Sequence, residues 1–304
     1  MGHDHGPDPA ATADRRRLTL VLAITGSVLV AEVVGAIWTG SLALLADAGH
    51  MLTDTAGLVM ALLAAHLVTR PPTSRRTWGF RRAETLAAAS QALLLLGVGI
   101  YVFVEGIRRL VEPPEVASVG MLVFGVVGLV GNVISIILLA RSRTGNLNLR
   151  AAFLEVLIDA LGSVAVIVAA IVIATTGWTR ADALVSLLIA VLILPRTVTL
   201  LRDTARVLLE STPAGLDLDE VRRHILEVPH IQDVHDLHAS QIATGLPVLS
   251  AHIVVDDECF HDGHIPRLLD QLQACVAGHF PVSVEHSTFQ FEQASHAQHE
   301  TGQH

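Results

Sequence analysis

The sequence contains few cysteines and few aromatic residues. Its 304 residues include two cysteines, Cys259 and Cys275, which are 16 positions apart. Two cysteines do not make a disulfide framework, and we expect an ordinary structural role for both. Aromatic residues make up 4% of the chain and the net charge is −9. An acidic chain lacks the basic footprint of nucleic-acid binding proteins, so nucleic acid is not an expected partner.

Apolar residues, by contrast, make up 51% of the chain and are concentrated before about position 210. Runs of about 20 or more apolar residues cross a bilayer as helices. The sequence predicts six such spans, at Leu18–Trp38, Ser41–Val68, Thr85–Leu110, Val116–Ala140, Arg150–Thr175 and Ala181–Leu201. We therefore expect an all-α six-helix transmembrane bundle at residues 18–209, after a His-bearing cytoplasmic tail at residues 1–17.

Basic residues in the short connections indicate the orientation of the bundle. Arginines at positions 15–17, 70–82 and 141–150 share one side, whereas the turn at Gly40 and the acidic segment Glu112–Glu115 lie on the other. We expect both termini in the cytoplasm. Short loops and the absence of organelle signals favour a bacterial plasma membrane.

Residues 210–292 have the composition of a soluble domain. Predicted helices are Asp217–Glu227 and His264–Gly278, and predicted strands are Ile231–Ile242, Pro247–Val255 and Val282–Glu292. The order αββαβ indicates a small α+β, ferredoxin-like cytoplasmic domain. Residues 293–304 lack periodicity and are expected to form a His-bearing disordered tail.

Two of the predicted spans carry ionisable side chains, which are costly in hydrocarbon and therefore indicate function. His50 and Asp54 are four residues apart in the second span, and Glu155 and Asp159 repeat this spacing in the fifth. Each pair lies one turn apart on one helix face. If the two helices face each other, one imidazole and three carboxylates could bind a single divalent cation. The alternative is two unrelated polar spots inside a bundle.

Other polar residues of the spans have less specific interpretations. Asp47 lies three residues before His50 and could support the metal ligands or line an exit path, with a structural polar contact as the alternative. Glu32 is interpreted as an interhelical hydrogen-bonding group. Arg82 and Asp203 lie at the cytoplasmic ends of the third and sixth spans, where they could form a charge interlock between the membrane and soluble parts.

These features together resemble the cation diffusion facilitator family of metal transporters. The likeness is strongest in SLALLADAGHMLTD and continues through TWGFRRAETLAA, NLNLRAAFLEVLIDALGSVAVIVAA, LLESTP and VHDLHASQI…LSAHIVVD, so that it covers residues 18–292. The resemblance implies a homodimer in which each membrane half holds one tetrahedral transport site. It also implies cytoplasmic domains that bind metal and tighten the dimer.

By position, His50 and Asp54 match the first ligand pair of the family, and Asp159 matches its last ligand. Glu155 stands where zinc-transporting members usually have histidine. An additional carboxylate shifts preference toward harder ions such as Mn²⁺ and Fe²⁺, although zinc also accepts oxygen ligands. We expect zinc first, with manganese, iron, cobalt and cadmium as alternatives.

The soluble domain contains further candidate metal ligands. The resemblance implies that His235, His252 and His286 match positions at which family members bind regulatory metal, and His264 lies near them in the sequence. Histidines are also common on the surface of acidic cytosolic domains, which is the alternative interpretation.

The expected function is efflux of a divalent cation in exchange for protons, because metal and protons compete for the same ligand atoms. The metal is then substrate and regulator, and no catalytic cofactor is expected. A membrane-bound metalloenzyme is disfavoured because no HExxH-type motif occurs. The remaining alternatives are an uptake carrier of the same fold and a membrane-anchored metal sensor.

Overall fold

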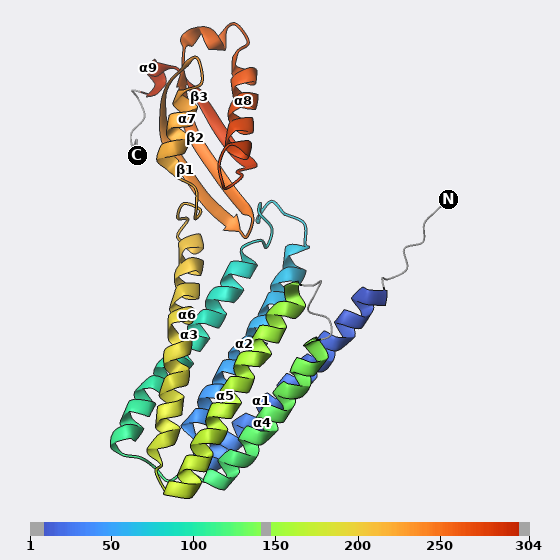
Figure 1. The fold of residues 1–304 in the computed structure, drawn as a ribbon. Helices are drawn as coiled ribbons and strands as arrows, with labels where there is room; N and C mark the ends of the chain where they lie inside the picture. The colour runs from blue at the N-terminus through green and yellow to red at the C-terminus, as the bar shows by residue number, and fades with distance from the viewer. Residues whose placement is uncertain (1–8, 141–146, 298–304) are drawn as a thin grey trace. The chain divides into compact units, whose positions relative to one another are not determined.

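The structure is a computed structural model that describes residues 9–140 and 147–297. Its first part consists of long helices, as Figure 1 shows: α1 (Pro9–Thr39), α2 (Leu42–Val68), α3 (Ala83–Val111), α4 (Ser118–Ala140), α5 (Leu147–Thr176) and α6 (Arg180–Leu208). The predicted six-helix bundle is confirmed. Among the described residues, five of these helices are long and apolar enough to cross a membrane, and α2 is not one of the five. The polar residues Asp47, His50 and Asp54 lie in α2.

Helix α1 begins before the predicted first span. Its first residue is Pro9, so that part of the expected tail at residues 1–17 is helical. Proline fits the first position of a helix because the missing N–H has no partner there, and the alanines that follow favour helix. At the other end, the short helix α9 (Ala294–Ala297) falls within the expected disordered tail. The remaining tail residues, 1–8 and 298–304, lie outside the described residues.

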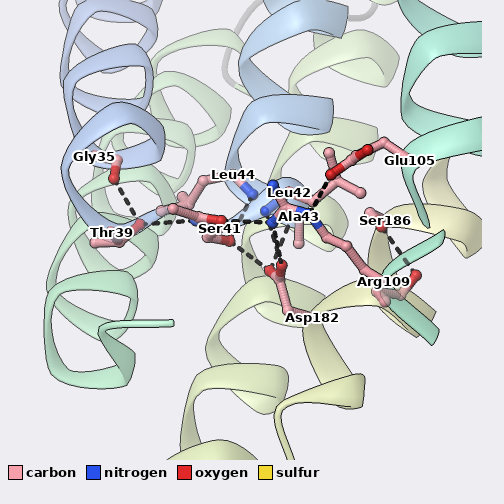
Figure 2. A network of polar contacts seen from close by, with 12 residues as sticks. Gly35, Thr39, Ser41, Leu42, Ala43, Leu44, Glu105, Arg109, Asp182 and Ser186 are labelled. Carbon is pink, nitrogen blue, oxygen red and sulfur yellow. Dashed lines mark hydrogen bonds and ion pairs between the residues drawn. The ribbon is translucent and has the colours of Figure 1, made fainter. Parts of the chain in front are cut away.

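A compact turn joins α1 to α2. Gly40 has a φ of +70°, a left-handed conformation that glycine adopts without steric cost. The carboxylate of Asp182, in the first turn of α6, accepts hydrogen bonds from the backbone nitrogens of Leu42 and Ala43 at 2.7 and 3.1 Å. The Ser41 hydroxyl donates to the same carboxylate at 2.5 Å (Figure 2). A side chain of α6 therefore caps the helix that carries His50.

Arg109 of α3 extends this network. Its guanidinium lies 3.7 Å from the Asp182 carboxylate and donates to the backbone oxygen of Gly40 at 2.6 Å. The same side chain forms an ion pair with Glu105 at 3.0 Å, which Figure 2 also draws. Polar contacts thus connect α2, α3 and α6 at the Gly40 end of α2.

Small residues let α1, α4 and α5 approach closely. A Cβ at Gly35 would lie 2.5 Å from the Phe124 ring, and one at Gly131 would lie 2.3 Å from Val28. Membrane helices pack on such residues because their association depends on close van der Waals contact. Gly128 of α4 and Gly162 of α5 likewise lie against the polar side chains of Glu32 on α1 and Asp47 on α2.

The C-terminal part has the predicted order αββαβ. It contains α7 (Leu218–Leu226), β1 (Ile231–Ala243), β2 (Leu246–Val255), the 3-10 helix η1 (Asp257–Phe260), α8 (Ile265–Gly278) and β3 (His286–Glu292). Strand β2 lies centrally, antiparallel to β1 and parallel to β3. Helices α7 and α8 bury Val221, Ile225 and Leu272 in the core. Strand β3 begins at His286, four residues later than predicted, and α8 begins one residue later.

Both cysteines are free and buried in this domain. Cys259 and Cys275 belong to the apolar core, at 1% and 7% exposure. Burial raises the pKa of each thiol above its ordinary value, with nearby carboxylates adding to the effect. The protonated thiols therefore pack as small apolar side chains.

The chain divides into two compact units. The first comprises residues 1–59 and 90–200, and the second comprises residues 60–89 and 201–304. The second unit thus contains one end of α2, α3 and α6 together with the αββαβ domain.

Candidate metal-transport site

The first unit brings three of the four predicted membrane ligands together. His50 Nε2 of α2 lies 3.5 Å from Asp54 Oδ2, one turn along the same helix. The same nitrogen lies 4.0 Å from Oδ1 of Asp159 on α5. His50 Nδ1 and Asp159 Oδ1 are buried and have no hydrogen-bond partner among the described residues. These atoms are therefore available to a ligand.

Glu155 lies at the margin of this group. It is one turn before Asp159 on α5, its side chain is exposed, and it is within electrostatic range of Asp54 and Arg196. One imidazole and two carboxylates form the interior of the site, and a third carboxylate stands beside it. Nitrogen and oxygen donors of this kind bind zinc and other divalent first-row ions.

Arg196 is a charged neighbour of the site that the sequence analysis missed. It follows Pro195 within α6 and lies within electrostatic range of both Asp54 and Glu155. With His50 neutral, the three carboxylates carry a charge of −3, and one arginine reduces the sum to −2. The available signal was that Arg196 is the single basic residue of the predicted span Ala181–Leu201.

Asp47 is buried one turn before His50 and contacts Glu32 of α1. Asp159 is within electrostatic range of Asp47 as well. Acidic side chains from α1, α2 and α5 therefore form a continuous group. The structure agrees with the expected interhelical hydrogen bonding of Glu32, and its partner is the carboxyl group of Asp47.

A second cluster lies in the αββαβ domain. His235 of β1 and His252 of β2 face each other across the antiparallel pair, with ring centroids 5.1 Å apart. Glu292 at the end of β3 reaches both, at 3.4 Å from His235 Nε2 and 2.7 Å from His252 Nδ1. Ligand atoms of these three residues lie within 4.8 Å of one another. Glu292 is a candidate ligand that the sequence analysis missed, although it ends a predicted strand.

His286 and His264 lie apart from that cluster. His286 begins β3 and pairs in register with Val248. Its ring packs edge-on against Trp78, with the ring centroids 4.9 Å apart. His264 precedes α8, with Nδ1 2.6 Å from Asp262 Oδ2. The hydrogen bond with His264 lowers the pKa of the exposed Asp262 carboxyl. The two histidines therefore have other neighbours than His235 and His252.

The two interlock candidates do not pair with each other in the described part of the chain. Arg82 Nη2 instead lies 2.7 Å from Glu210 Oε1, just beyond the end of α6. Asp203 lies 3.9 Å from Arg206, one turn along its own helix. Glu210 has a φ of +56° in the turn that ends the helix, and this turn presents its side chain. The ion pair of Arg82 is made with Glu210 because that turn, not the last helical turns, is within its reach.

Comparison with known proteins covers nearly the whole chain. The model of the cation efflux transmembrane domain matches residues 18–209, and that of the cation efflux protein cytoplasmic domain matches residues 213–294. The metal cation efflux system protein CzcD of Cupriavidus metallidurans is 43% identical over 100% of this chain and 94% of its own length. The zinc transporter ZitB of Escherichia coli is 41% identical over 96% of this chain and 93% of its own.

A further relative is named a cadmium, cobalt and zinc/H(+)-K(+) antiporter. It comes from Bacillus velezensis and is 38% identical over 85% of this chain and 82% of its own length. Both family models and the bundle with its αββαβ domain agree with the resemblance read from the sequence. This integral membrane protein therefore belongs to the cation efflux, or cation diffusion facilitator, family of metal transporters.

Proposed function

We propose that this protein exports a divalent metal cation from the cytosol in exchange for protons, with zinc as the first candidate. The observation that carries the proposal is the convergence of His50, Asp54 and Asp159 between two membrane helices. Buried ionisable groups in a membrane bundle are expensive and mark ion pathways. Relatives named as a zinc transporter and as a cadmium, cobalt and zinc antiporter support the same cargo.

Competition for ligand atoms couples the two ions. A cation binds deprotonated carboxylates and a neutral imidazole, so binding displaces protons and protonation displaces the cation. Protons that enter from the outer side release the metal outward. Rearrangement of helices around a central site supplies alternating access, as in other secondary transporters.

Topology and assembly form part of the proposal. Both termini are cytoplasmic, the membrane is a bacterial plasma membrane, and the protein is a homodimer. The arginine bias of the connections supports the orientation, and the match to the cytoplasmic domain model supports the placement of the αββαβ domain.

The His235, His252 and Glu292 cluster serves as a regulatory metal site in the cytoplasmic domain. Two nitrogens and one carboxylate suit Zn²⁺, which takes N and O ligands in a tetrahedral set. The cluster joins all three strands of the sheet, so a bound ion stabilises their pairing. His264 and His286 remain candidates for separate surface contacts with metal.

Which divalent ion the protein transports depends on Glu155. Its carboxylate makes the donor set harder than one with two histidines, which favours Mn²⁺ and Fe²⁺ relative to zinc. Cobalt and cadmium are the other candidates. Zinc remains the first candidate because it binds both histidine nitrogen and carboxylate oxygen.

Metal-driven proton flux tests the proposal directly. Proteoliposomes that contain a pH dye receive Zn²⁺, Co²⁺, Cd²⁺, Mn²⁺ or Fe²⁺ in turn. Wild-type protein should move protons with at least one ion, and Asp159→Asn should abolish the flux while the protein stays folded. Asp203→Asn is the control, because Asp203 is 60% exposed and outside the site. Flux that persists in Asp159→Asn refutes the site, and no flux in the wild type favours a metal sensor.

A further inference from the structure

Glu32 of α1 and Asp47 of α2 form a buried acidic pair. Their exposures are 0% and 3%. Apart from the contact between the two carboxyl groups, neither oxygen of Glu32 nor Oδ2 of Asp47 has a hydrogen-bond partner among the described residues. Buried polar groups are normally satisfied, whereas these carboxyl oxygens have no partner among the described residues beyond the other carboxyl group.

Two glycines make room for these carboxyl groups. A Cβ at Gly128 of α4 would lie 2.5 Å from Glu32 Oε1, and one at Gly162 of α5 would lie 2.7 Å from Asp47 Oδ1. Any larger residue at either position would displace the acidic side chain beside it. Four helices thus enclose the pair, and two of them contribute only backbone at the point of contact.

The nearest hydroxyl and amide use their donors elsewhere. Ser163 donates its hydroxyl proton to the backbone oxygen of Asp159 at 3.1 Å. Asn132 in turn donates to the Ser163 hydroxyl at 3.4 Å. Both side chains line this part of the interior, and neither bond reaches Glu32 or Asp47.

The charged groups around the pair have the same sign. The electrostatic neighbours of Glu32 are Asp47 and Asp159, which are both acidic. Removing two carboxylates from water without a counter-charge costs far more than a folded protein can tolerate. Among the described residues, the neighbours of the pair supply no positive charge. The charge is therefore compensated by a proton held between the two carboxyl groups or, when metal is present, by a cation that displaces this proton.

We propose that Glu32 and Asp47 form a second binding position for the divalent cargo, between the His50 group and the Gly40 end of α2. The inference rests on the proposed transport function. Asp47 lies three residues before His50 on the same helix, and both acidic residues are within electrostatic range of Asp159. Two carboxylates balance the charge of one divalent cation. Oxygen ligands are accepted by zinc and preferred by harder divalent ions.

Zinc binding by the full chain in lipid nanodiscs tests this position. The starting variant carries His235→Ala and His252→Ala, which remove the cytoplasmic cluster. Adding His50→Ala and Asp159→Ala should abolish metal-driven proton flux but leave one Zn²⁺ per protomer in the membrane part. X-ray absorption should show oxygen neighbours and no imidazole around that ion. Adding Glu32→Gln should then remove it.

Controls separate this inference from the transport proposal. Glu105→Gln in the same background should leave the ion bound, because Glu105 pairs with Arg109. Asp47→Asn, which keeps the side-chain volume, replaces Glu32→Gln if the latter does not fold. Flux that survives His50→Ala and Asp159→Ala refutes the transport site alone. If Glu32→Gln and Asp47→Asn both leave the number of bound Zn²⁺ ions unchanged, the second binding position is overturned. This holds also if the two substitutions change only the number of protons exchanged per metal ion.

Discussion

The carboxylate of Asp182 lies 2.7 Å from the backbone nitrogen of Leu42. The two residues are 140 positions apart, yet this contact caps the first turn of α2 with a side chain of α6. The helix that carries His50 is therefore held at one end by another helix. Asp182 is a positioning residue for the proposed transport site, since it fixes the end of α2 without touching His50.

Asp182→Ala should destabilise the membrane bundle. The substitution removes a helix cap, which costs about 1–2 kcal/mol, and it leaves the nearby Arg109 without this carboxylate. Asp182→Asn should lose less stability, because an amide oxygen still accepts hydrogen bonds from backbone N–H groups. Thermal unfolding in nanodiscs measures the difference. Equal stability of the alanine variant and the wild type would contradict the capping role.

Glu155→His should move the metal preference toward zinc. The change replaces a carboxylate by an imidazole beside Asp159 and reduces the negative charge of the donor set by one. Flux assays with Zn²⁺ and Mn²⁺ give the ratio of the two rates. If the wild type already carries zinc, and the ratio stays the same in Glu155→His, position 155 does not set selectivity.

Arg196→Gln should slow release of the cargo. Without this arginine the carboxylates near Asp54 carry a charge of −3, so the cation binds more tightly and half-maximal flux occurs at a lower metal concentration. Combining Arg196→Gln with Glu155→His restores the charge and should restore the wild-type value. Arg202→Gln, on the exposed surface of the same helix, is the control. A double variant that keeps the lowered half-maximal metal concentration of Arg196→Gln would contradict this charge argument.

Glu292→Gln should weaken metal binding by the cytoplasmic cluster at least about tenfold, the equivalent of about 1.4 kcal/mol. The substitution keeps the shape but removes the negative charge that faces His235 and His252. Zinc titration of the full chain carrying His50→Ala and Asp159→Ala provides the measurement. The His286→Ala variant should bind zinc with unchanged affinity, since the ring of His286 packs on Trp78 and lies apart from the cluster. A larger loss with His286→Ala than with Glu292→Gln would place the site elsewhere.

Exchanging the charges of Arg82 and Glu210 should restore the thermal stability that either single substitution removes. Their side chains are 39% and 60% exposed, so the ion pair contributes no more than about 1 kcal/mol. Arg82→Glu should lower the unfolding temperature slightly at low salt, and Arg82→Glu with Glu210→Arg should recover it. The same measurements at 1 M salt should show no difference, because salt screens exposed charges. A double variant as unstable as Arg82→Glu would exclude the pair.

Patterns within a short stretch of sequence were sufficient for the secondary structure. Apolar runs predicted the helices from α1 to α6, and the four-residue spacing placed His50 with Asp54 on one helix face. The order αββαβ followed from alternation and turn residues. Each of these features depends on neighbours along the chain, which is why periodicity alone reveals it.

Contacts between distant segments were decided only by the tertiary structure. Glu292 joins His235 and His252 because the register of three strands aligns them. Glu32 meets Asp47 because glycines of α4 and α5 leave space there. No local pattern encodes such encounters, since they depend on how helices and strands pack. The sequence by itself determined which groups could bind a cation, and the packing decided which of them meet.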